Sequence, residues 1–145
     1  MEKIKINEIL PYLNTGNFFY VFDNPKYLTN FIKKYPDGIA TIEATIDNFK
    51  EFILDKNYKL ILKPISNLIK NNNLDRNLER IFSVYDDKYE IIDGFIEEVD
   101  TFDSNPYYFH YPIVMELIRN HYDVFCLIEK GFAINVNDFD VKIYD

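Results

Sequence analysis

The chain has 145 residues, of which 48% are hydrophobic and 17% aromatic, and its formal net charge is −8. This size and composition are typical of one globular domain, residues 1–145, with a substantial core. A net negative charge disfavours direct binding to the nucleic-acid backbone or to an anionic membrane. No apolar run reaches the length of about 18 residues that a membrane-spanning helix needs. We therefore expect a cytoplasmic protein that folds without a disulfide, since Cys126 is its single cysteine.

The charge is distributed unevenly along the chain. Residues 1–84 carry 12 Lys or Arg and 10 Asp or Glu, whereas residues 85–145 carry 4 and 14. Such an asymmetry within one small domain is a hint about partners rather than about fold.

The first part of the chain predicts short strands that alternate with short helices. Aromatic and β-branched runs predict strands at Phe18–Phe22, Ile39–Ile42 and Tyr58–Lys63. Apolar residues at helical spacing predict helices over Asn24–Ile32, over Phe49–Ile53 with Thr45 or Asp47 as the cap, over Ser66–Ile69 and over Leu74–Val84.

The longest helical pattern lies between Pro112 and Lys130. Pro112 suits a first helical turn, and Gly131 can take the left-handed conformation that ends a helix. Asp123 could instead cap a second helix and split the segment in two. Closer to the C-terminus, apolar and polar residues alternate over Phe139–Tyr144 and predict a half-exposed strand. These elements predict an α+β fold, in which a small, mostly antiparallel sheet packs against several helices.

The sequence contains few residues that could form a nucleophilic or metal-binding site. His110 and His121 are the only histidines, and Cys126 would lie about 140° from His121 on one helix, so the two would not meet. Cys126 stands in an apolar run and is expected to be a buried, inert thiol. The spacing of His110, His121, Asp123 and Cys126 matches no metal-binding motif. We therefore expect a protein that is not an enzyme and that needs no cofactor or metal.

The acidic segment Asp86–Asp103 carries the most specific functional hypothesis. Spaced carboxylates can imitate the phosphates of a nucleic acid and occupy a basic cleft, and the alternative is a solvated face. Interspersed Ile and Phe residues indicate a folded surface rather than a disordered tail. The candidate partner-binding residues are Asp86, Asp87, Glu90, Asp93, Glu97 and Glu98. Tyr107, Tyr108, Tyr111 and Tyr122 are either core aromatics or interface anchors.

Three stretches together resemble a family of small proteins encoded by phages and prophages of Bacteroidetes: Asn7–Leu13, Leu60–Leu68 and Asp123–Asn135. The chain departs from that family at Lys63, where arginine is usual, at Ile65–Ser66–Asn67, where Leu-Ser-Asp is usual, and at Cys126, where glycine is usual. The resemblance covers about a fifth of the chain and supplies no catalytic residue. It implies phage origin and a small host-facing or replication-accessory role.

Phage origin makes inhibition of host defence the leading hypothesis. The chain would be an acidic binding protein that blocks a host nucleic-acid-processing machine, and an anti-CRISPR protein acting on an RNA-targeting type VI effector is one concrete case. Its partner would be a host protein, such as a CRISPR effector nuclease with a basic groove. The alternative is a phage DNA-metabolism accessory or structural protein without a host target.

Overall fold

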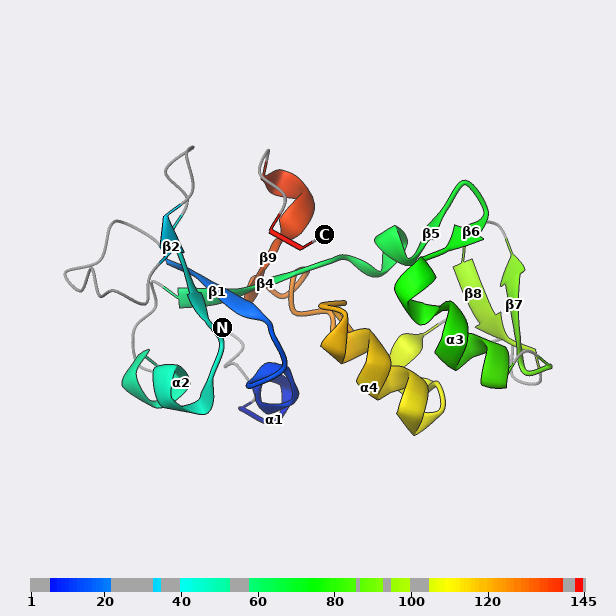
Figure 1. Ribbon diagram of the computed structural model, residues 1–145, viewed down its shortest axis with the longest axis horizontal. Helices are drawn as coiled ribbons and strands as arrows, with labels where there is room; N and C mark the ends of the chain where they lie inside the picture. The colour runs from blue at the N-terminus through cyan, green and yellow to red at the C-terminus, as the bar shows by residue number, and fades with distance from the viewer. Residues whose placement is uncertain are drawn as a thin grey trace.

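The computed structural model describes residues 6–21, 33–34, 40–52, 58–85, 87–92, 95–99, 105–139 and 143–144. A five-stranded sheet forms one end of an elongated molecule, and helices α3 (Arg76–Val84) and α4 (Tyr111–Arg119) with a β-hairpin form the other (Figure 1). This arrangement confirms the predicted α+β fold.

The five-stranded sheet has the order β2-β3-β1-β4-β9. Its strands are β1 (Phe18–Val21), β2 (Lys33–Lys34), β3 (Ala40–Glu43), β4 (Tyr58–Leu62) and β9 (Ala133–Asn135). All pairs are antiparallel except β4–β9, in which Leu60 lies opposite Ala133 in a parallel register. The strands predicted around β1, β3 and β4 are thus confirmed, whereas β9 was not predicted.

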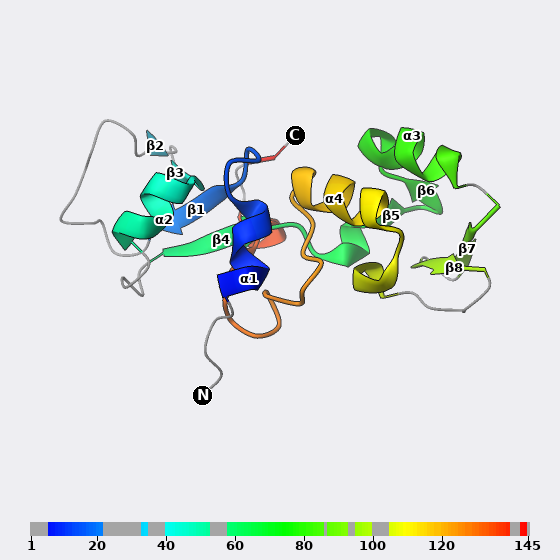
Figure 2. The same cartoon turned by 90° about the horizontal axis from the view of Figure 1, so that it is seen from below.

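Short helices and two hairpins complete the described chain. Helices α1 (Ile6–Ile9) and α2 (Ile46–Phe52) cover one face of the sheet (Figure 2). The 3₁₀ helices are η1 (Leu10–Tyr12), η2 (Ile65–Leu68), η3 (Pro106–Tyr108) and η4 (Val136–Asp138), and the hairpins pair β5 (Ile69–Lys70) with β6 (Asn73–Leu74) and β7 (Tyr89–Ile92) with β8 (Phe95–Glu98). Every helix in the described ranges is too short or too polar to cross a membrane.

The local signals for helices have three different outcomes. Thr45 Oγ1 accepts the N–H of Asn48, so Thr45 rather than Asp47 caps α2, and α3 forms where it was predicted. The predicted Ser66 cap is wrong, because η2 begins at Ile65 and its preceding residue, Pro64, makes no side-chain cap. The helix predicted over Asn24–Ile32 lies outside the described residues, as do residues 140–142 of the strand predicted over Phe139–Tyr144.

The long helix predicted from Pro112 to Lys130 is wrong beyond Arg119. Pro112 does lie in the first turn, but the backbone of Lys63, the residue after β4, pairs with the chain where the helix would continue. Lys63 N–H donates to the His121 carbonyl (2.7 Å), and Asp123 N–H donates to the Lys63 carbonyl (2.9 Å). His121 has a φ of 73°, which no helical residue adopts. Asp123 then accepts the N–H groups of Leu127 and Ile128 and builds a turn, not a second helix.

Candidate partner-binding site

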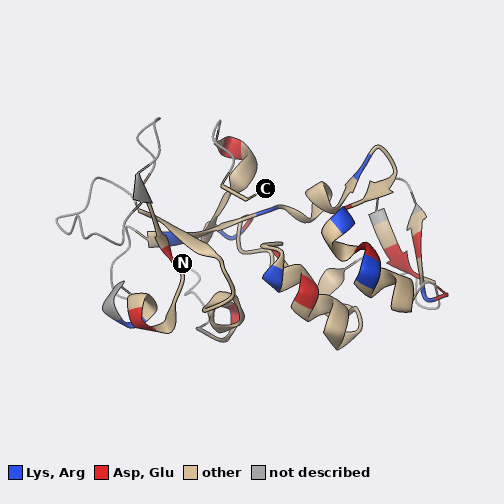
Figure 3. Ribbon diagram, in the orientation of Figure 1, with Lys and Arg blue, Asp and Glu red and all other residues tan. Residues whose placement is uncertain are grey.

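The β7–β8 hairpin holds the described part of the acidic segment (Figure 3). Directly opposed residues of an antiparallel pair share one face, and successive residues alternate between faces. Glu90 is opposite Glu97, and this pair therefore occupies the face away from the buried Tyr89 and Ile96. Glu90 is exposed and Glu97 is half-buried. Two like charges opposite each other destabilise a hairpin unless another group neutralises them.

A second pair places Glu98 on the other face. It lies opposite Tyr89, whose hydroxyl hydrogen-bonds with Nδ1 of His110 (2.6 Å) and accepts the N–H of His110 (3.0 Å). Burial raises the pKa of Tyr89, and the charge of Glu98 adds to that shift. The Tyr89 ring also packs edge-on against Phe82 of α3 and Phe109. The hairpin is thereby anchored to both α3 and the segment that leads into α4.

An apolar groove of about 360 Å³ lies between α3 and the hairpin. Its described lining is largely hydrophobic and aromatic: Leu74, Phe82, Tyr89, Ile91 and Ile96. The charged residues that the structure places in this lining are two glutamates, Glu79 and Glu90. Ile91 is 40% exposed and Val84, at the end of α3, is 71% exposed. An apolar centre with a charged rim is the usual anatomy of a protein interface.

The predicted acidic residues are only partly brought together. Glu90 and Glu97 form the outward pair, Asp87 is exposed at the turn that leads into β7, and Glu98 belongs to the anchored face. Asp86 and Asp93 lie outside the described residues. Sequence reasoning missed Glu79, although it stands one residue after Leu78 on the amphipathic helix α3, because only the fold places it in the same groove lining as Glu90.

The candidate tyrosines separate into two groups. Tyr107, Tyr108 and Tyr111 are 54%, 63% and 74% exposed, as interface anchors would be. Tyr122 is buried, so it is not a surface anchor. Its hydroxyl donates to Oδ2 of Asp75 (2.5 Å), the N-cap of α3. Burial raises the pKa of Tyr122, and the Asp75 carboxylate raises it further.

The structure places the histidines and the cysteine in separate environments. His110 contacts Tyr89, whereas the His121 ring stacks on Tyr144. The prediction that Cys126 is buried within a helix is wrong, because it is exposed in the turn that Asp123 builds. Partial desolvation raises the thiol pKa nonetheless, and the charge of the nearby Asp123 adds to that effect. A protonated thiol is a weak nucleophile. Among the described residues, no three His, Cys, Asp or Glu side chains are grouped to hold a metal ion.

Comparison with known proteins adds no relative to this picture. The chain matches no protein-family model, and no curated protein or solved structure is significantly similar to it. The resemblance to phage-encoded proteins therefore stays a prediction that rests on the three sequence stretches.

Proposed function

We propose that this chain is a non-catalytic binding protein that docks a basic partner on the outward face of the β7–β8 hairpin. The observation that carries the proposal is the opposition of Glu90 and Glu97 on the outward face. The apolar groove is lined mainly by the other face of the hairpin, and Glu90 borders it. A partner segment that places an arginine or lysine between Glu90 and Glu97 complements this pair.

Electrostatic repulsion within this surface favours the binding of a basic partner. The Glu90–Glu97 repulsion persists in the free protein and is relieved when a positive group arrives between them. Charge complementarity also steers a basic partner toward the hairpin and accelerates association. That acceleration falls with salt, because the screening length shrinks from about 10 Å at 0.1 M to about 3 Å at 1 M.

The resemblance to phage-encoded proteins supplies the biological setting of the proposal. In that setting the partner is a host defence complex that processes nucleic acid. The protein inhibits this complex by occupying its nucleic-acid-binding groove. We propose an RNA-targeting type VI CRISPR effector as the concrete target, which makes the chain an anti-CRISPR protein. Its site of action would then be the cytoplasm of the host cell.

The test uses a purified type VI effector loaded with guide RNA. The wild-type chain should bind it with a salt-dependent association rate and reduce cleavage of a target RNA. The variant E90K/E97K should associate at least tenfold more slowly at low salt and lose the inhibition. The matched control is E43K/D47K, which reverses two exposed charges near α2, at the sheet end of the molecule, and should behave as wild type.

Two results would count against the proposal in different ways. Equal association rates for E90K/E97K and E43K/D47K would show that the hairpin is only a solvated face. Failure of the wild-type chain to bind the effector, together with co-purification of phage replication proteins from infected cells, would favour the accessory role in phage DNA metabolism.

A further inference from the structure

The apolar groove between α3 and the β7–β8 hairpin has a preformed floor. Phe82, Tyr89 and Ile96 are buried and belong to its lining. The Phe82 and Tyr89 rings meet edge-on, with centroids 5.5 Å apart. Two hydrogen bonds between the Tyr89 hydroxyl and His110 hold the Tyr89 ring in this position. A partner therefore meets an apolar surface that is already ordered, which lowers the entropic cost of binding.

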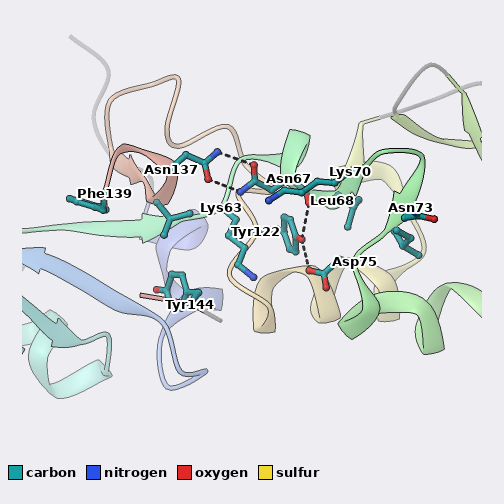
Figure 4. Close-up of a pocket in the computed structure, with 12 residues that line it drawn as sticks. Lys63, Asn67, Leu68, Lys70, Asn73, Asp75, Tyr122, Asn137, Phe139 and Tyr144 are labelled. Carbon is teal, nitrogen blue, oxygen red and sulfur yellow. Dashed lines mark hydrogen bonds between the residues drawn. The ribbon is translucent and has the colours of Figure 1, made fainter. Parts of the chain in front are cut away.

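The helical wall of the groove is fixed at the N-terminal end of α3. Asp75, the N-cap, accepts the N–H of Asn77 through Oδ1 and the hydroxyl of the buried Tyr122 through Oδ2 (Figure 4). Helix residues three and four positions apart share one face. On α3 this face places Glu79, Phe82 and Ser83 along the groove.

The rim of the groove combines an exposed apolar side chain with two carboxylates. Ile91 is 40% exposed and lies directly opposite the buried Ile96, so both are on the hairpin face that lines the groove. Glu79 and Glu90 are exposed, and neither makes an ion pair in the part of the chain that the structure describes. The described lining contains no Lys or Arg. An apolar centre thus has a negatively charged edge.

We propose that this groove binds one large apolar side chain of a partner polypeptide, in which arginine or lysine residues flank that side chain. Charge complementarity selects this occupant. Basic residues on either side of the apolar side chain would approach Glu79 and Glu90, whereas a fatty acid or a nucleotide would bring a further negative charge to them. The groove volume of about 360 Å³ is near the lower end of the range of about 300–1,000 Å³ for sites that hold a whole ligand, and it suits a single side chain.

This inference rests on the proposed function, because it assigns the apolar anchor to the same basic partner that binds Glu90 and Glu97. The two contacts should control different steps of binding. Charges steer the partner and accelerate association, whereas loss of a buried apolar contact mainly accelerates dissociation. The kinetics of variants can therefore separate the groove from the outward pair.

The first test titrates the isolated chain with synthetic peptides and follows its backbone amide signals by NMR. The parent peptide has one leucine with two arginines on each side, a second peptide has serine for leucine, and a third has glutamine for every arginine. The parent should shift the signals of Phe82, Ser83 and Ile91 and should bind about tenfold more tightly than either of the others. I91S should lose this preference for leucine. The matched control I46S removes an apolar side chain that is 43% exposed, at the start of α2, and should behave as wild type.

A second pair of variants leaves the apolar lining unchanged. E79Q should weaken binding of the arginine peptide and leave binding of the glutamine peptide unaltered. E43Q removes an exposed carboxylate from β3, outside the groove lining, and should change neither. Circular dichroism establishes that each variant is folded.

The type VI effector supplies the kinetic test. I91S should dissociate from it about tenfold faster with an unchanged association rate, in contrast to the slower association of E90K/E97K. An effector that does not bind the wild-type chain would refute the proposed function, and the peptide titrations would then decide separately on the groove.

Equal affinities of the leucine and serine peptides would overturn the apolar anchor. Equal affinities of the arginine and glutamine peptides, or tighter binding of decanoate than of the parent peptide at the same signals, would overturn the basic occupant. No binding of the parent peptide by the folded chain, or equal losses in I91S and I46S, would overturn the site itself.

Discussion

The hydroxyl group of Tyr12 donates a hydrogen bond of 2.7 Å to the backbone carbonyl of Tyr122. The same hydroxyl accepts the N–H of Val124 (3.0 Å), and Tyr12 is fully buried. One side chain near the N-terminus thus satisfies two backbone groups in the segment that follows α4. The three stretches on which the phage resemblance rests meet here, because Lys63 pairs with the backbone on both sides of Tyr122.

Replacing Tyr12 by phenylalanine should destabilise the protein by about 1–2 kcal/mol, because it removes two buried hydrogen bonds and leaves the Tyr122 carbonyl and the Val124 N–H only the 3.1 Å bond that they make with each other. Urea unfolding monitored by circular dichroism would measure the loss. The control is Y111F, which removes a hydroxyl from a residue that is 74% exposed and should change stability by less than about 0.5 kcal/mol. Equal effects of the two substitutions would show that the Tyr12 bonds contribute nothing.

His121 should make stability depend on pH. Its ring stacks on Tyr144 with centroids 3.7 Å apart, and Nδ1 lies 2.8 Å from Oδ1 of Asn17. Burial, assisted by the charge of Lys63, lowers its pKa from 6.5 to about 4. Between these values the unfolded chain binds a proton that the folded chain does not. The free energy of unfolding therefore falls as pH falls from 6.5 toward 4, and it gains nothing further above 6.5.

The substitution H121N removes this titration and keeps a residue that tolerates positive φ. The stability difference between wild type and H121N should change by about 2 kcal/mol between pH 7 and pH 4, after allowance for the partial exposure of the ring. Burial also raises the pKa of Asp123, but Asp123 is present in both proteins, so its contribution cancels. Parallel pH profiles for the two proteins would refute the assignment.

Sequence patterns correctly predicted the elements whose residues have a strong local preference for strand or helix. The strands around Phe19 and Ile61 and the amphipathic helix around Leu78 formed where the sequence placed them. The end of α4 was not predictable, because Phe125, Leu127 and Ile128 continue the apolar helical spacing. What ends that helix is the backbone pairing of Lys63 with His121 and Asp123, a contact between distant parts of the chain.

Features that depend on contacts between distant segments could not be predicted from the sequence. Glu79 is an exposed helix residue, and only the packing of the hairpin against α3 places it in the same groove lining as Glu90. The polar run of Asn71 to Asn73 predicts a loop, but only the pairing of β5 with β6 shows that it sets Lys70 against Asn73. The outward pairing of Glu90 with Glu97 likewise requires the hairpin register, which charge counting does not give.

Cys126 has a φ of 59°, a left-handed conformation that glycine adopts without strain. The predicted resemblance to phage-encoded proteins places glycine at this position, and the left-handed conformation would give that glycine a physical reason. C126G should stabilise the protein by about 0.5 kcal/mol, because relief of about 1–2 kcal/mol of backbone strain exceeds the extra entropy of an unfolded glycine. C126A keeps the strain and should be close to wild type in thermal unfolding. A glycine variant less stable than the alanine variant would contradict this account.

The last prediction concerns Glu90 and Glu97 in the free protein. Reversing one charge, in E90K or in E97K, converts a repulsive cross-strand pair into an attractive one and should stabilise the fold by about 0.2–1 kcal/mol. Reversing both restores a like-charge pair, so E90K/E97K should return to wild-type stability. The coupling energy from this double-mutant cycle isolates the pair from the wider charge of the hairpin, and it should shrink in high salt because Glu90 is exposed. Additive effects of the two substitutions would mean that the carboxylates do not interact, and the electrostatic reason for a basic partner at this face would be lost.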